Sequence, residues 1–484
     1  MLMRVLIVSV VLIGVISALY LEELWSGEHA WKEYQAEAKA RGTKLTIAEF
    51  IRPPIKDEDN FAAIPLFQDL FDTNKFGTMD PFTFPHASTT NRWLGQPTDF
   101  VAWRNKFVEE SFYTNVTGNA ARDVLEALKV FDADLAQLRA AASRPDCRFP
   151  VDYSKGLATL FPQMTPSMHV SRVLRLRMAA ELAEGNSSDA YADFKLGLRI
   201  CRATEHDLSL ISGLVRIAML SELEAAVHEG LVTGRWSPSE ISGIQNELAV
   251  LNLTADCEFT TQSERAVTNE ELDRLFGGRT QLVDFSLLFS GGNLSHIDWP
   301  GTLAILMFPR GWVRQNEVVI NKFCDAEIAR LDVKTGRILA VPTESAIRSG
   351  LGCDGPLGKY YYAVANFLLP ASDHSFRRYA SCQTQTEMAM AACALERFRI
   401  ARTAYPEKLE NLVPEFAPDV PLDPVDGKPL RYERQPDGGF VLWSPDFEHK
   451  FATLASTNAP PVATNATEFV SGQIEQWVWR QPAR

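Results

Sequence analysis

The segment LAEGNSSDAYADF, residues 182–194, joins two helical patterns through a glycine and an asparagine. On both sides of it, apolar residues recur at spacings of three and four, which is typical of amphipathic helices. Breaks at Gly185-Asn186, near His206-Asp207 and at Gly234 separate four predicted helices: Pro166–Glu184, Ser188–Glu205, Leu208–Gly230 and Ser237–Leu251. Helices with such short connections pack antiparallel. The sequence therefore predicts a body of antiparallel helical hairpins.

The start of the fourth helix has the clearest local signal. Ser237-Pro-Ser-Glu240 supplies an N-cap, a proline at the first helical position and the glutamate of a capping box. The hairpin around Gly185 resembles a tetratricopeptide-type turn, but the chain has one such hairpin and no clear repeat of about 34 residues. We therefore expect an irregular helical body and not a regular solenoid.

The composition of the chain changes along its length and indicates four parts. We expect a transmembrane anchor at 1–21, a stalk helix with wrapping loops at 22–118, an α-helical body at 119–375 and a small α/β domain at 376–484. Further helices are predicted at 119–143, 264–275, 311–331, 359–369 and 376–402. After residue 402 the pattern changes to short strands and turns. The predicted fold class is mainly α.

The N-terminal segment VLIVSVVLIGVISALY, residues 5–20, has no charged side chain. With the preceding residues it covers about 20 positions, enough for a helix to cross the roughly 30 Å hydrocarbon core of a bilayer. Arg4 precedes the segment and Glu22-Glu23 follow it, and positive charge favours the cytoplasmic side. We expect a single-pass anchor with a cytoplasmic N-terminus and an extracytoplasmic, periplasmic body. A signal peptide cleaved after Ala18 is the alternative, and it also exports the body.

Charge and cysteine content exclude several classes of protein. The 484 residues include 61 acidic and 48 basic side chains, a net charge of −13, which argues against nucleic-acid binding. The seven cysteines include no CxxC pair, so zinc binding has little support. Cys382 and Cys393 lie about 16 Å apart along one predicted helix, which is too far for a disulfide between them. We expect no cofactor.

Catalytic motifs are weak. Gly350-Leu-Gly-Cys-Asp-Gly355 matches GxGxxG, but no buried strand precedes it. None of the eight histidines forms HExxH, and there is no GxSxG. The acidic clusters Asp57–Asp59 and Glu270–Asp273 are interpreted as solvated charge, since a glycosidase needs two carboxylates that face each other across a sugar.

The arginines of the helical hairpins are the candidate ligand-binding residues. They form two pairs, each three residues apart and so on one helix face: Arg172 with Arg175, and Arg199 with Arg202. Together they would suit a groove for an acidic peptide or polyanion. Pairing with Glu181, Asp193 and Glu205 is the alternative, and we favour it.

The segment Ala391–Ser444 reads AACALERFRIARTAYPEKLENLVPEFAPDVPLDPVDGKPLRYERQPDGGFVLWS. It resembles the head of the major pseudopilin of type II secretion, where an amphipathic helix precedes YP with spaced leucines, DP, a glycine–proline turn and a small sheet ending near a serine. The matching positions are Tyr405-Pro406, Leu409, Leu412, Asp423-Pro424, Gly427, Pro429, Tyr432 and Ser444. The resemblance implies a small, pseudopilin-like α/β domain.

The chain departs from the pseudopilin family at both of its hallmarks. Family members have an N-terminal helix with a processed glycine and a glutamate five residues in, and Met1–Tyr20 has neither. The family binds calcium through acidic residues after the serine, and here only Asp446 and Glu448 remain near that position as candidate metal ligands. The chain is therefore not itself expected to be a pilin subunit.

The whole plan of anchor, helical body and YPEKL…DPVDGKPLRY tail is also similar to large sets of uncharacterised, singly anchored bacterial envelope proteins. This similarity implies an envelope location and no activity. The sequence leaves the question of an enzyme open and favours a non-enzymatic binding or scaffold protein with an envelope protein partner. An extracytoplasmic hydrolase acting on polysaccharide or peptide is the alternative, and a pure spacer is a third.

Overall fold

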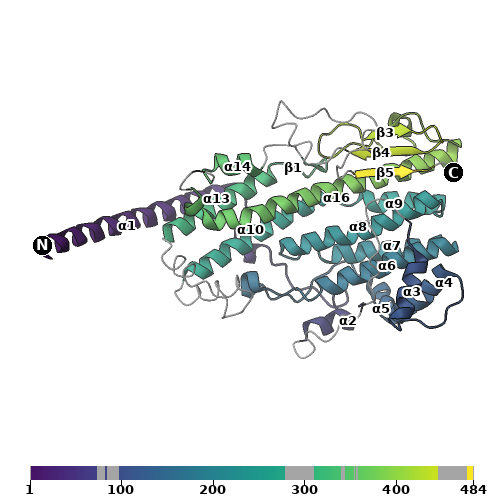
Figure 1. The fold of residues 1–484 in the computed structure, drawn as a ribbon, viewed down its shortest axis with the longest axis horizontal. Helices are drawn as coiled ribbons and strands as arrows, with labels where there is room; N and C mark the ends of the chain where they lie inside the picture. The colour runs from purple at the N-terminus through teal and green to yellow at the C-terminus, as the bar shows by residue number, and fades with distance from the viewer. Residues whose placement is uncertain are drawn as a thin grey trace.

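The computed structural model describes residues 2–72, 82–83, 97–277, 310–338, 344–353, 355, 358–444 and 477–482. It is mainly helical, as predicted. An elongated body carries one long helix, α1 (Leu2–Ala40), which projects from one end (Figure 1). The N-terminus lies at the tip of α1 and the C-terminus lies at the opposite end of the body.

The predicted helical hairpins are confirmed. The four helices are α6 (Met164–Glu184), α7 (Ser187–Ala203), α8 (Leu210–Thr233) and α9 (Pro238–Ala249). Gly185 and Gly234 end α6 and α8 with φ values of +88° and +68°, a left-handed conformation that glycine adopts at little cost. At the start of α9 the Glu240 carboxylate accepts the Ser237 backbone N–H at 3.0 Å, which completes the predicted capping box.

Short helices precede this layer in the chain, between residues 47 and 158. They are η1 (Ile47–Glu49), α2 (Pro65–Gln68), η2 (Asp69–Phe71), α3 (Phe100–Glu109), α4 (Ala120–Leu128), η3 (Lys129–Phe131), α5 (Asp132–Ala141) and η4 (Tyr153–Ala158). Helix α4 packs on α3 and α6. Val124 and Leu128 of α4 and Leu135 of α5 are fully buried, so apolar burial against α6 holds these helices to the body.

Three long α-helices and two short ones follow the layer in the described chain. They are α10 (Leu253–Gly277), α13 (Arg310–Ile328), α14 (Glu344–Gly350), α15 (Gly358–Tyr361) and α16 (Ala363–Arg402). Helix α10 begins before the predicted start at residue 264. Helix α16 runs from α13 and α14, near the anchor, to the sheet at the other end (Figure 1).

Helix α16 is continuous where the sequence predicted two helices. Proline removes a backbone donor and usually interrupts a helix, and we placed the break beside Pro370. Tertiary contacts hold the helix on both sides of that position. The backbone N–H of Ala365 donates to Asn316 Oδ1 at 2.9 Å, and Phe376 and Tyr379 are buried in the main core. One helix therefore crosses the expected domain boundary at 375/376.

Two small antiparallel sheets complete the fold. β1 (Leu331–Asp332) pairs with β2 (Arg337–Ile338), and β3 (Arg431–Arg434), β4 (Phe440–Ser444) and β5 (Trp477–Gln481) form a sheet in that order. Trp479 packs its ring 4.4 Å from the His228 ring of α8, and Gln481 Nε2 donates to the Leu231 carbonyl oxygen at 2.9 Å. One core, which extends from Phe61 to Trp479, includes residues of both the body and the sheet. All seven cysteines are buried.

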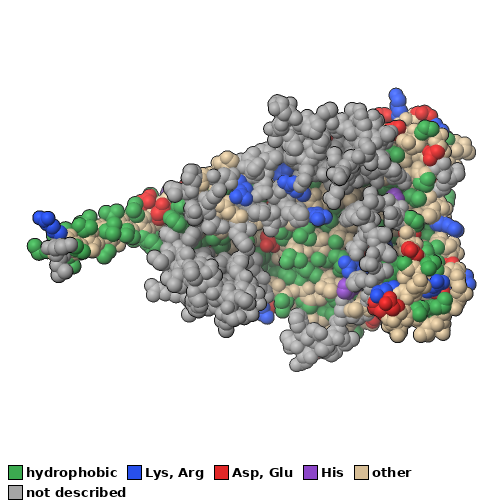
Figure 2. All heavy atoms as spheres, viewed as in Figure 1, with side chains coloured by type: hydrophobic (Ala, Val, Ile, Leu, Met, Phe, Trp, Pro, Cys, Tyr) green, Lys and Arg blue, Asp and Glu red, His purple; other side chains and the backbone are tan. Residues whose placement is uncertain are grey.

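Residues 22–40 do not form a free stalk. They continue the helix of the apolar segment, and Trp31, Tyr34 and Ala38 are buried against α13. By contrast, the apolar side chains before residue 22 are exposed, and Figure 2 shows them along the face of α1 in view. This part of α1 is long and apolar enough to span a membrane.

Candidate functional site

A groove of about 380 Å³ lies between α5, α7 and α9. Helix α7 supplies three basic side chains to it, Lys195, Arg199 and Arg202, because residues three or four apart lie on one helix face. Arg139 adds a fourth basic side chain, and Glu247 is the single acidic one. The remaining lining is apolar: Ala142, Ala192, Leu196, Leu198, Val250 and Leu251.

Arg199 is the most firmly held of the four basic groups. Its guanidinium donates to the backbone carbonyl oxygens of Arg144 and Asp146 at 3.0 and 2.9 Å. The same group lies 4.3 Å from the centre of the Phe61 ring, a cation–π contact. Burial lowers the pKa of Arg199, but arginine remains charged in proteins. The groove therefore has a positive charge in a fixed position.

The other basic groups differ in how much of their charge is neutralised. Arg139 forms an ion pair with Asp193 at 2.6 Å, and Arg202 forms a longer one with Glu205 at 3.4 Å. Lys195 is exposed and lies 4.8 Å from the Tyr191 ring centre. Within the described residues, no carboxylate forms an ion pair with Lys195. Lys195 and Arg202 are therefore the groups most available to a ligand.

The structure divides the four predicted arginines between two places. Arg199 and Arg202 line the groove. Arg172 and Arg175 instead lie on either side of Glu222 of α8, at 3.7 and 3.4 Å, and that glutamate is buried. Sequence reasoning missed the two other basic residues of the lining, Lys195 and Arg139. The spacing of Lys195 from Arg199 could have identified the lysine, whereas the position of Arg139 depends on how α5 packs.

We favoured the alternative that Glu181, Asp193 and Glu205 pair with the four predicted arginines. This holds for one of the three carboxylates. Glu205 does pair with Arg202. Asp193 pairs with Arg139 and Arg177, at 2.6 and 3.0 Å, and Glu181 accepts from the Asn186 side chain at 2.8 Å. Arg139 and Arg202 of the groove therefore have carboxylate partners. The positive charge that the groove retains comes from Lys195 and Arg199.

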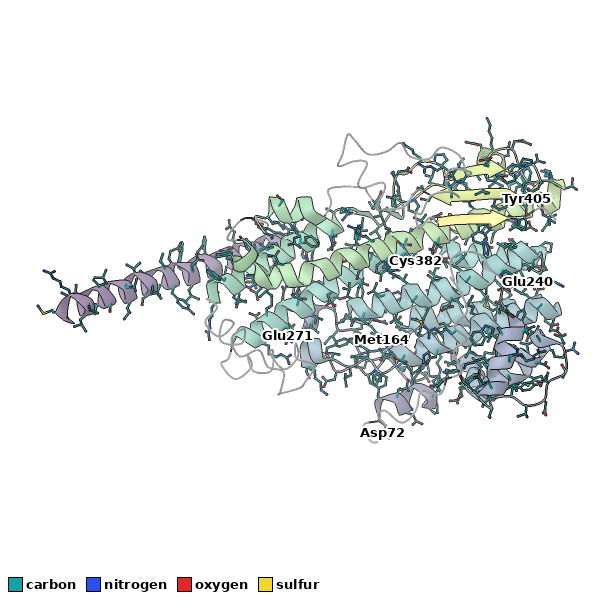
Figure 3. All side chains as sticks on the ribbon, in the orientation of Figure 1. Asp72, Met164, Glu240, Glu271, Cys382 and Tyr405 are labelled. Atoms are coloured by element: carbon teal, nitrogen blue, oxygen red, sulfur yellow. The ribbon has the colours of Figure 1, made fainter. Side chains whose placement is uncertain are left out.

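The acidic cluster at 270–273 has structural partners. Glu270 accepts the Ile47 backbone N–H at 2.7 Å, Glu271 pairs with Arg274, and Asp273 pairs with Arg314. Glu271 lies toward the anchor end, far from Tyr405 beside the sheet (Figure 3). Glu270 and Asp273 therefore connect α10 to η1 and α13, and the Glu271 pair lies within α10.

The remaining sequence motifs give no metal or nucleotide site in the described chain. The segment with GxGxxG follows a helix, since α14 ends at Gly350. No group of three or more potential metal ligands gathers among the described residues. Asp446 and Glu448 lie outside them.

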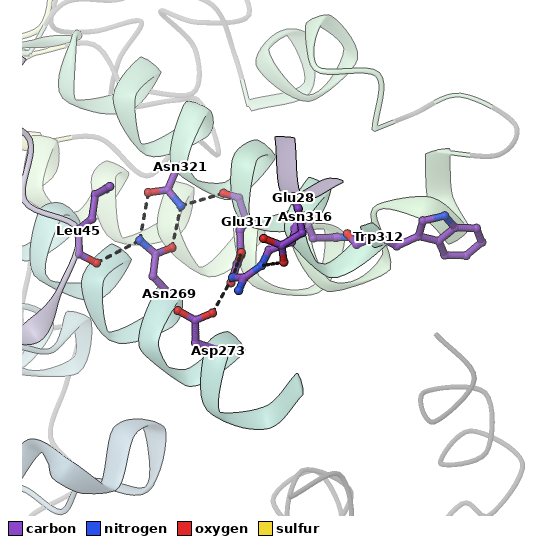
Figure 4. A network of polar contacts seen from close by, with 9 residues as sticks. Glu28, Leu45, Asn269, Asp273, Trp312, Asn316, Glu317 and Asn321 are labelled. Carbon is purple, nitrogen blue, oxygen red and sulfur yellow. Dashed lines mark hydrogen bonds and ion pairs between the residues drawn. The ribbon is translucent and has the colours of Figure 1, made fainter. Parts of the chain in front are cut away.

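A second polar cluster, which sequence reasoning missed, joins the anchor helix to the body (Figure 4). Arg314 of α13 pairs with Glu28 of α1 at 3.0 Å, with Asp273 of α10 at 2.6 Å and with Glu317 at 2.7 Å. Burial raises the pKa of Glu317 to about 8. Three helices that are far apart in sequence therefore meet at one arginine.

Asp325 makes a similar junction further along α13. It accepts from Arg265 of α10 at 2.7 Å, from the Tyr34 hydroxyl at 2.8 Å and from Arg41 at 2.6 Å. Arg265 is only 1% exposed. These contacts fix α1 against α10 and α13 and set the orientation of the body relative to the anchor.

Comparison of the chain with protein-family models, curated proteins and solved structures returns no match.

Proposed function

We propose that this chain is a non-enzymatic, membrane-anchored binding or scaffold protein of the cell envelope, with an extracytoplasmic body. Its groove between α5, α7 and α9 would hold an acidic segment of an envelope protein partner. The observation that carries the proposal is the charge of the groove. Four basic side chains and one carboxylate line it, on a chain whose net charge is −13. Such local complementarity attracts and orients an acidic partner.

The apolar lining favours a peptide over a small inorganic anion. Val250 is 68% exposed, and Leu251 and Leu196 lie beside it in the same groove. A helix or strand with acidic residues on one edge and apolar residues on the other would cover these side chains and pair with Lys195 and Arg202. Because contacts already fix Arg199, less conformational entropy is lost at that position on binding.

The anchor supports a scaffold role. The arginine clusters hold α1 to α10 and α13, and α5, α7 and α9 lie at the end of the body away from α1 (Figure 1). A partner in the groove would therefore be held at a set distance from the membrane.

We also propose that residues 391–444 have a pseudopilin-like arrangement, which would suit contact with a secretion or pilus-like assembly. Contacts between the matching positions support this. Ser444 Oγ donates to Asp423 Oδ2 at 2.6 Å, and the Tyr432 hydroxyl donates to the Pro406 carbonyl oxygen at 2.7 Å. Leu409 and Leu412 are buried.

The test is binding of a fluorescein-labelled glutamate decamer to the full-length protein in nanodiscs, followed by anisotropy. We expect the double variant Lys195→Glu/Arg202→Glu to weaken binding about tenfold, since two exposed pairs of up to about 1 kcal/mol each are lost and repulsion is added. Binding should also weaken as salt is raised.

The matched control is Arg122→Glu, which reverses an exposed arginine of α4 that pairs with Glu184 outside the groove. It should leave peptide affinity within about twofold of the wild type, because it touches no groove residue. Absence of binding to the wild type, or an equal loss in the control, would overturn the proposed function.

A further inference from the structure

The body begins almost where the apolar segment of α1 ends. Leu21 is the last residue of that segment, and Glu23 already contacts the body. The Tyr361 hydroxyl donates to the Glu23 carboxylate at 2.9 Å. The backbones of Glu23 and Gly311 also touch, since a Cβ atom on Gly311 would lie 1.9 Å from the Glu23 carbonyl oxygen. At about 1.5 Å per residue, Glu23 lies roughly 3 Å beyond Leu21 along the helix axis.

This distance places part of the body within the lipid headgroup layer. A bilayer of about 40–45 Å with a hydrocarbon core of about 30 Å has a polar layer of roughly 5–8 Å on each side. Because Glu23 lies inside that layer, the residues packed on it, Gly311 at the start of α13 and Tyr361 of α15, lie at the same depth. A helix tilt of about 20° changes this depth little.

The side chains at this depth have the chemistry that membrane interfaces favour. Trp25 of α1 is 67% exposed. On the body, the rings of Trp312 and Tyr361 lie 5.1 Å apart, and Trp312 is part-exposed. Figure 4 shows Trp312 projecting away from the polar cluster that holds the helices. Arg310 is exposed at the first position of α13. Trp and Tyr are enriched where headgroups meet the hydrocarbon.

We propose that Arg310, Trp312 and Tyr361, together with Trp25, form a surface that contacts lipid headgroups. The body then rests on the bilayer and is held by two contacts, the spanning helix and this surface, which together limit its tilt. This inference concerns the lipid and is independent of any ligand in the groove. The surface contains Glu23 as well as Arg310, so its contact with lipid is made through the aromatic rings and does not require anionic lipid.

The test uses the full-length protein in phosphatidylcholine nanodiscs with and without a lipid that carries a nitroxide on its headgroup. The nitroxide quenches tryptophan emission at headgroup depth. We expect Trp312→Phe to reduce the quenched part of the emission by the contribution of one tryptophan. Trp25→Phe serves as the positive control. Trp236→Phe, which removes a buried tryptophan of the body, should leave the quenched part unchanged.

A second measurement does not depend on removing an aromatic ring. Because all native cysteines are buried, Arg310→Cys can be labelled selectively with a fluorophore, with Arg122→Cys as the control. We expect headgroup nitroxide to quench the label at 310 and not the label at 122. Quenching that responds to Trp25→Phe alone, with neither Trp312→Phe nor the label at 310 affected, would show that only the anchor reaches the lipid and would overturn the proposal.

Discussion

Gly27 of α1 and Gly311 of α13 lie in backbone contact. A Cβ atom built on Gly27 would lie 2.2 Å from the Gly311 carbonyl oxygen, closer than real Cβ contacts. The two helices can approach this closely only because both positions lack a side chain. The close approach also brings Glu28 within 3.0 Å of Arg314. Backbone packing and an ion pair therefore hold α1 against α13.

Gly311→Ala should weaken this junction. The new Cβ would meet the Glu23 carbonyl oxygen at 1.9 Å, so α1 and α13 must separate, at a cost of about 1–3 kcal/mol. Thermal unfolding of the full-length protein in nanodiscs measures the loss. Gly14→Ala is the control, since nothing lies within 4 Å of that position in the apolar segment. Equal midpoints for both variants would show that the close approach is not needed.

Asp325→Asn should be strongly destabilising. The substitution removes the charge that Arg265 faces at 2.7 Å, and an unpaired arginine that is 1% exposed costs about 3–5 kcal/mol. Denaturant unfolding would report the difference. Asp99→Asn is a suitable comparison because Asp99 caps α3 by accepting the Ala102 N–H, and asparagine caps a helix equally well. A loss below about 1 kcal/mol for Asp325→Asn would contradict the pairing described.

Features that depend on one helical turn could be predicted from the sequence. The ends of α6 and α8 follow from the glycines at 185 and 234, and the start of α9 follows from the capping box at 237–240. The docking of residues 22–40 could not be predicted. Trp31, Tyr34 and Ala38 have the spacing of a buried stripe, but their partner helix α13 lies far along the chain. Such a stripe indicates that the helix packs against another element, but it does not identify that element.

The candidate site, too, could be predicted only as far as local helical spacing determines it. Arg199 and Arg202 share a groove because three residues along one helix keep them on one face. That spacing holds equally for Arg172 and Arg175, yet they face Glu222 instead. Which helix face meets α5 and which meets α8 is decided by tertiary packing. Local spacing alone cannot distinguish the two pairs.

The pH dependence of stability should reveal whether Glu224 is protonated in the folded protein. Burial raises its pKa from 4.5 to about 8, while the Thr386 hydroxyl donates to it at 2.6 Å. Between these two pH values the folded protein holds a proton that the unfolded chain releases, so stability falls as pH rises. Glu224→Gln removes this effect. We expect the variant to match the wild type near pH 5 and to exceed it by on the order of 3 kcal/mol above pH 8.

Unfolding midpoints of the wild type and the variant, measured from pH 5 to pH 8.5, provide the check. The difference between the two proteins matters here, because burial lowers the pKa of His228 to about 4 and gives the opposite slope below pH 6.5 in both. Glu109→Gln, on the exposed surface of α3, should run parallel to the wild type. A Glu224→Gln curve that is also parallel would show that Glu224 is ionised in the folded protein.

Ser444→Ala tests the link between the DPVDGKPLRY turn and β4. Asp423 is fully buried, and its carboxylate accepts from Ser444 Oγ at 2.6 Å, from the Val425 N–H at 3.0 Å and from Arg431 at 3.2 Å. Removal of one donor to a buried carboxylate costs about 1.5–3 kcal/mol. We expect a loss of that size in denaturant unfolding, with faster hydrogen exchange at Val425.

Ser154→Ala is the matched control, because Ser154 Oγ donates to Asp152 at the same distance of 2.6 Å but at the surface. Its loss should stay within about 0.5 kcal/mol, as for most surface substitutions. Both serines donate to an aspartate at the same distance. The difference between the two losses in unfolding free energy therefore measures the effect of burial on this hydrogen bond. If Ser444→Ala costs no more than Ser154→Ala, the Asp423–Ser444 bond does not hold the turn to the strand. The proposed pseudopilin-like arrangement would then lose its strongest support.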